Sequence, residues 1–154
     1  MKSFPGDGYQ NSLFAPRSAW TPPDLSSLPS WAEAKRVAID VETRDPHLKK
    51  LGVGVRRGGF VCGVSFAIED GPSHYLPIRH VSGNLEEGKV WQYLKDQARV
   101  YTGIIVGANL PYDLDYCAEN GVVFRRASMF RDVQVASPLI NENVFTHSLE
   151  AIAQ

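Results

Sequence analysis

The chain has 154 residues, of which 44% are hydrophobic and 21% charged, and its formal net charge is −1. These values are ordinary for a soluble protein of one domain. No apolar run approaches the roughly 18 residues of a membrane span, and the start lacks the features of a secretory signal, so we expect a cytoplasmic protein that does not contact membranes. A module that binds nucleic acid by electrostatics alone is usually clearly basic, so the net charge leaves the function open.

Residues 1–30 are rich in proline, glycine and serine and show no apolar period. This composition predicts an irregular arm. Its aromatic residues would be unusual in a free tail, which favours partial docking of the arm on the domain. We expect the globular domain to span residues 31–154, opened by Ser30 at the cap of a short helical turn.

Three strands are predicted first. Residues 36–42 form an apolar strand with carboxylates at its end, and residues 60–68 alternate between apolar and other side chains. Asp70 and Gly71 indicate a turn, after which residues 75–79 form the return strand. Pro77 has no N–H to donate to a ladder, so the return strand should lie at an edge of the sheet.

Helices and short strands alternate in the second half. Apolar residues at helical spacing follow Asn84 and Glu87, which look like a capping pair. A buried strand at 104–108, a helix at 111–119, a strand at 129–132 and a helix at 133–139 come next, and residues 146–154 begin another helix. Three antiparallel strands followed by such units predict an α/β fold, with helices packed on a mixed sheet.

Asp40 and Glu42 are two apart on the first strand, so their side chains project from the same face. Two neighbouring carboxylates repel one another, and a divalent cation such as Mg²⁺ is the natural compensation. The alternative interpretation is a solvated strand end. If the strand at 104–108 lies beside the first strand, Asp113 arrives next to both acids. Taken singly, however, Asn109 and Asp113 also fit a helix cap and a first-turn acid.

Three short motifs occur together: Asp40-Val41-Glu42-Thr43, Asn109-X-X-Tyr112-Asp113 and Phe130-Arg131-Asp132 before a helix. In this combination the chain resembles the 3′–5′ proofreading exonuclease domain of family A, polymerase I-like DNA polymerases, in particular those of phages. These domains belong to the DnaQ-like, ribonuclease H-fold superfamily. The resemblance covers residues 31–154.

The resemblance implies a ribonuclease H-like mixed sheet of five strands in the order 3-2-1-4-5, with flanking helices. It implies that Asp40, Glu42 and Asp113 are catalytic and hold two divalent metal ions, Mg²⁺ or Mn²⁺, for phosphodiester hydrolysis. Thr43, Asn109 and Tyr112 would bind nucleic acid. The implied partners are the 3′ end of single-stranded DNA and a polymerase domain C-terminal to this segment. The implied setting is the cytoplasm of a bacterial cell or a phage-infected host.

One part of the family pattern is missing. The third motif, a Tyr or His followed by a fourth Asp on a final helix, does not occur after Asp113, so we expect a domain truncated before its last helix. Asp132 is interpreted as the cap of the helix that follows it. Two alternatives stay open: an exoribonuclease of the same superfamily, and an inactive fragment that only binds nucleic acid.

Four basic residues, Lys49, Lys50, Arg56 and Arg57, lie in the loop after the first motif. Such loops are usually only solvated, and phosphate contact is the alternative. Arg125, Arg126 and Arg131 would extend a phosphate-binding patch if there is one.

Overall fold

A computed structural model describes residues 20–153 of the protein. Its strands are β1 (Arg36–Arg44), β2 (Phe60–Ile68), β3 (Ser73–Pro77), β4 (Ile104–Gly107) and β5 (Met129–Asp132). Its helices are the 3₁₀-helix η1 (Leu25–Ser27) and α1 (Leu48–Leu51), α2 (Glu87–Val100), α3 (Leu110–Glu119), α4 (Val133–Ile140) and α5 (Leu149–Ile152). Each of these helices is too short or too polar to span a bilayer.

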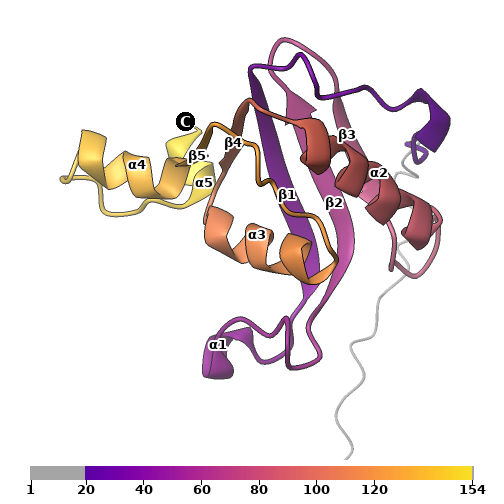
Figure 1. Cartoon of the computed structure of the whole chain (residues 1–154). Coiled ribbons are helices and arrows are strands. Elements are labelled where there is room, and N and C mark those ends of the chain that lie inside the picture. Colours follow the sequence, from indigo (N-terminus) through magenta and orange to yellow (C-terminus); the bar gives the residue numbers. More distant parts are fainter. Residues whose placement is uncertain (1–19, 154) are drawn as a thin grey trace, which may run out of the picture.

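The strands form one sheet in the order β3-β2-β1-β4-β5 (Figure 1). β1, β2 and β3 pair antiparallel, while β1, β4 and β5 pair parallel. The predicted strand order is therefore confirmed, and β3 lies at the edge as Pro77 requires. Because β1 is central and parallel to β4, the carboxyl ends of these two neighbouring strands point the same way and lie close together.

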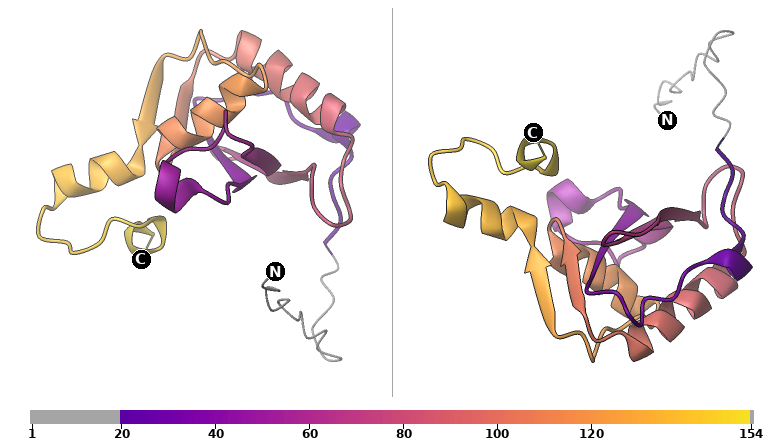
Figure 2. Two further views of the ribbon diagram at one scale, coloured as in Figure 1. Left: turned by 90° about the horizontal axis from the view of Figure 1, so that it is seen from below. Right: turned by 90° about the horizontal axis from the view of Figure 1, so that it is seen from above.

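The two faces of the sheet differ. Along β1, Val37, Ile39 and Val41 are buried, whereas Asp40 and Glu42 between and after them are exposed. Figure 2 shows α2 and α3 together on one side of the sheet, which is the side of the buried residues. The predicted projection of Asp40 and Glu42 from one face is confirmed, and that face is not the one that α2 and α3 cover.

Trp31 lies at the centre of the hydrophobic core and is fully buried. Its ring contacts four aromatic rings from distant parts of the chain: Phe66, Tyr93, Tyr101 and Phe124. Part of the predicted arm packs here as well, since Leu25 and Leu28 contact the core and the Tyr93 hydroxyl donates to the Pro29 carbonyl at 2.7 Å. Residues 1–19 of the arm lie outside the described residues.

Two local predictions had different outcomes. Ser30 accepts a hydrogen bond from the Ala32 N–H at 3.3 Å and the Ala34 N–H donates to the Trp31 carbonyl at 3.0 Å, so the predicted short turn is present. Asn84 bonds back to the backbone of His80 instead of capping α2. Glu87 is the first residue of α2, and its carboxylate pairs with the Arg79 guanidinium at 2.7 Å. The predicted capping pair of Asn84 and Glu87 was therefore wrong, because a local bond holds Asn84 and a tertiary ion pair holds Glu87.

Candidate active site at the carboxyl end of β1

Asp113 connects α3 to the backbone of β1. β4 pairs with β1 only as far as Ala38 and Val106, so the rest of that side of β1 has no strand partner. α3 starts just after β4, and Asp113 in its first turn is 3% exposed. Its Oδ1 accepts a hydrogen bond from the Val41 N–H at 3.0 Å. A carboxylate from α3 is thereby placed against the peptide that lies between Asp40 and Glu42.

Negative charge accumulates at this point. Burial raises the pKa of Asp113 to about 7, and the charges of Asp40 and Asp132 add to the rise, against the opposing effect of the hydrogen bond from Val41. Desolvation also raises the pKa of Asp40. The charge of Asp40, another of the three predicted acids, thus contributes to the raised pKa of Asp113.

The raised pKa of Asp113 predicts a pH-dependent stability in metal-free buffer. Its pKa is 3.8 ordinarily and about 7 in the folded protein. The folded state therefore binds the proton more tightly, and its stability should fall as the pH rises between these two values. Urea unfolding in EDTA at several pH values, compared with an Asp113→Asn variant, would measure this. The variant should lose less stability over this range than the unaltered chain, and equal losses would contradict the assignment.

The acids do not form a compact three-residue cluster. Within residues 20–153 there is no group of three His, Cys, Asp or Glu side chains that could hold a metal ion. The structure places Asp113 against β1 through the Val41 N–H, while Asp40 and Glu42 are both exposed on that strand. The metal centre of Asp40, Glu42 and Asp113 stays a prediction.

The predicted nucleic-acid-binding residues lie beside the acids. The register of β1 and β2 shifts between Glu42 and Thr43, and Thr43 is partly buried. Its hydroxyl bonds that of Tyr112 at 2.5 Å, which joins the end of β1 to the first turn of α3. Register shifts like the one between Glu42 and Thr43 are frequent next to active sites. The structure therefore pairs Thr43 with Tyr112 beside the acids.

Asn109 occupies the cap position of α3 in the left-handed conformation, with φ 56°, but its side chain makes no capping bond. Asp132 serves in its place, since its carboxylate accepts the N–H groups of Asn109 at 3.1 Å and of Leu110 at 2.7 Å. Asp132 also accepts the N–H groups of Gln134 and Val135, so the predicted cap of α4 is confirmed. The Asp132 carboxylate thus caps the first residues of both α3 and α4, and the Asn109 side chain takes no part in capping α3.

Tyr75 is a residue of the site that the sequence did not single out. Gly63 lies opposite Glu42 in the β1–β2 ladder, and a Cβ on Gly63 would come within 2.2 Å of the Tyr75 hydroxyl. The phenol therefore lies over Gly63, beside Glu42, where it bonds the His80 Nε2 at 2.5 Å. Burial raises the pKa of Tyr75, and the charges of Glu42 and Asp40 contribute. A glycine inside a strand is the signal that could have indicated this close approach.

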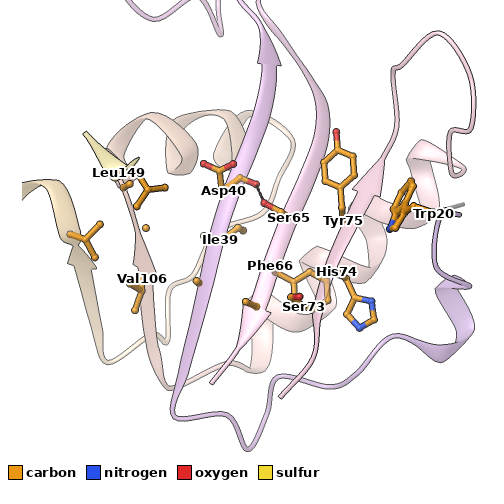
Figure 3. A pocket seen from close by; sticks show the side chains of 15 residues that line it. Trp20, Ile39, Asp40, Ser65, Phe66, Ser73, His74, Tyr75, Val106 and Leu149 are labelled. Atoms are coloured by element: carbon orange, nitrogen blue, oxygen red, sulfur yellow. Dashed lines mark hydrogen bonds between the residues drawn. The ribbon is translucent and has the colours of Figure 1, made fainter. Parts of the chain in front are cut away.

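A groove of about 480 Å³ runs over the exposed face of the sheet. Figure 3 shows Asp40 and Tyr75 projecting on this face, with Ser65 between their strands. The groove is mostly apolar and is lined in part by Trp20, Asp40, Ser65, Tyr75, Val106 and Leu149. It places room for a ligand directly beside Asp40.

Comparisons with known proteins relate this chain to DNA polymerases. The chain is 58% identical over 140 residues to a DNA-directed DNA polymerase of Pseudomonas phage M6; the match covers 89% of this chain and 21% of the phage protein. It is 23% identical over 138 residues to DNA polymerase I of Pseudomonas aeruginosa, covering 84% of this chain and 14% of that protein. The chain therefore spans about a fifth or less of these relatives. No family model matches it.

Solved structures show the fold. NrnC of Brucella melitensis, bound to pGG, superposes with a TM-score of 0.53 at 23% identity, over 82% of this chain and 55% of that one. The same protein with bound Mg²⁺ gives a TM-score of 0.52. The predicted ribonuclease H-like fold is confirmed by the sheet order and by these neighbours. The chain is thus homologous to a segment of a phage DNA polymerase, and the predicted relation to polymerase I-like DNA polymerases is confirmed.

Proposed function

We propose that this chain is a 3′–5′ exonuclease domain that removes nucleotides from DNA 3′ ends and serves the proofreading of a DNA polymerase. The observation that carries the proposal is the Asp113 carboxylate bonded to the Val41 N–H between Asp40 and Glu42, in a chain with extensive identity to a phage DNA polymerase. The polymerase domain itself would lie C-terminal to this segment, as a further part of the same polypeptide.

The donor chemistry of the site fits a divalent cation. Asp40 and Asp113 offer carboxylate oxygens, the ligands that Mg²⁺ and Mn²⁺ prefer, and burial raises the pKa of both carboxyl groups. Asp40 and Asp113 would hold the cation, and Glu42 would join them or a second ion. A bound pair of such ions supplies an activated water and stabilises the departing 3′ oxygen. Because Mg²⁺ keeps several waters, two protein carboxylates are enough to retain one ion.

The neighbouring residues would hold the substrate. Tyr112, fixed by its bond to Thr43, is available to pack against the terminal sugar or base. Asn109 has its amide free of the helix cap and exposed to solvent at the start of α3. These residues would orient the 3′-terminal nucleotide so that its scissile phosphate faces Asp40 and Asp113.

The test uses the purified chain and a 5′-labelled single-stranded DNA oligonucleotide with Mg²⁺ or Mn²⁺. We expect a ladder that shortens from the 3′ end and that disappears with EDTA and in an Asp40→Ala variant. An RNA oligonucleotide of the same sequence separates the exonuclease from the exoribonuclease alternative, because preference for RNA would reject the DNA assignment. Binding without any cleavage in either metal would select the alternative of an inactive binding fragment.

A further inference from the structure

The four basic residues of the loop between β1 and β2 fall into two groups. Arg57 is used internally, because its guanidinium donates to the carbonyls of Leu51, Gly52 and Val53. Arg56 faces α3, where it lies 3.7 Å from Asp115 and 3.8 Å from Glu119. These two arginines are therefore engaged within the fold.

Lys49 and Lys50 differ from the arginines. They lie on α1 and are exposed, and among residues 20–153 no carboxylate forms an ion pair with either. Arg44, the last residue of β1, is exposed and also forms no ion pair within residues 20–153. Unpaired positive charge in this loop is thus concentrated on α1 and the end of β1.

The loop that carries α1 is fixed against α3. The Asp45 carboxylate accepts the Gly54 N–H at 2.6 Å and the Tyr116 hydroxyl at 3.0 Å. Gly59 lies so close that a Cβ there would come within 2.2 Å of the Tyr116 hydroxyl. Figure 1 shows α1 beyond the end of β1 and below α3. The lysines are therefore presented from a tethered loop that begins three residues after Glu42.

The charge of the site explains why such a patch is needed. Asp40, Glu42 and Asp113 repel the phosphates of a nucleic acid, and this repulsion acts over about 10 Å at 0.1 M salt. Arg125 and Arg126 cannot offset this repulsion, because they precede β5 and so lie at the amino ends of the parallel strands, opposite the acids. Lys49 and Lys50 have no ion pair within residues 20–153, and their loop follows the carboxyl end of β1, which carries Asp40 and Glu42.

We propose that Lys49 and Lys50 bind the phosphodiester backbone of the single-stranded nucleic acid whose 3′ end lies at Asp40, Glu42 and Asp113. The proposal rests on the proposed function for the position of the 3′ end. Its chemistry is electrostatic and independent of sequence, because each lysine ammonium neutralises one phosphate and releases its counterion.

The test measures binding of a single-stranded DNA oligonucleotide in EDTA, which prevents cleavage, over a range of salt concentrations. The Lys49→Ala/Lys50→Ala variant should bind more weakly at low salt. The plot of the logarithm of the association constant against the logarithm of the salt concentration should become less steep by about 1.4, because each lost phosphate contact contributes about 0.7 to the slope. The matched control is Lys35→Ala/Lys89→Ala, which removes the same charge before β1 and on α2. Its slope should equal that of the unaltered chain.

Three outcomes would overturn the inference: an unchanged slope in the α1 variant, an equal fall in the control, or no binding by the unaltered chain. An unchanged slope together with a 3′ ladder that needs Asp40 would reject the lysine patch and leave the exonuclease intact. A reduced slope in the α1 variant alone, without a ladder in either metal, would support the patch and reject the exonuclease activity.

Discussion

Replacing Asp113 by asparagine should lower the exonuclease activity at least about 100-fold without unfolding the protein. A metal ion supplies several kcal/mol of transition-state stabilisation, and each 1.36 kcal/mol corresponds to a factor of ten in rate. The amide oxygen of asparagine can still accept the Val41 N–H. Because asparagine removes a buried charge beside Asp40, the variant should be at least as stable as the unaltered chain near pH 8. Initial rates on a labelled oligonucleotide and urea unfolding in EDTA measure the two effects.

Two further variants separate charge from structure. Asp113→Ala leaves the buried Val41 N–H without an acceptor, so it should cost about 1–3 kcal/mol of stability in addition to the activity. Asp115→Asn is the matched control, since Asp115 lies on the same helix but faces Arg56 at 3.7 Å. The Asp115→Asn variant should cleave the oligonucleotide at a rate within about twofold of that of the unaltered chain. Full activity in Asp113→Asn, or an equal loss in Asp115→Asn, would remove Asp113 from the site.

Replacing Trp31 by alanine should destabilise the protein by about 3–5 kcal/mol, the usual cost of removing a buried large aromatic side chain. Trp31 is 0% exposed. The centroid of its ring lies 5.0 Å from the ring centroid of Phe66 and 6.1 Å from that of Phe124. Domains of this size are stable by roughly 5–15 kcal/mol in total, so the variant should be near the limit of folding. Urea unfolding followed by circular dichroism at 25 °C measures the difference.

Trp20→Ala provides the comparison for this prediction. Trp20 is 53% exposed and contacts Tyr75 at a centroid distance of 6.0 Å, so its loss should cost less than about 1 kcal/mol. A cost for Trp31→Ala no greater than that for Trp20→Ala would mean that Trp31 is not the centre of the core.

The sequence determined the elements and their faces. Alternation along β1 predicted that Asp40 and Glu42 project together, and the exposed and buried residues of β1 agree. Pro77 predicted an edge strand because it cannot donate to a second neighbour, and β3 is at the edge. The spacing of buried residues in α2, including Val90, Trp91 and Leu94, was also readable. These properties have short periods, so a few neighbouring residues are enough to express them.

Only the tertiary structure decided how these elements meet. The bond from Val41 to Asp113 joins residues 72 apart, and it exists because β4 stops while β1 continues. The approach of Tyr75 to Glu42 depends on the register of β2 with both of its neighbours. The ion pairs of Arg56 with Asp115 and Glu119 on α3 likewise depend on the position of the loop. Offsets between distant elements are set by the packing of the whole core, and no local pattern in the chain encodes them.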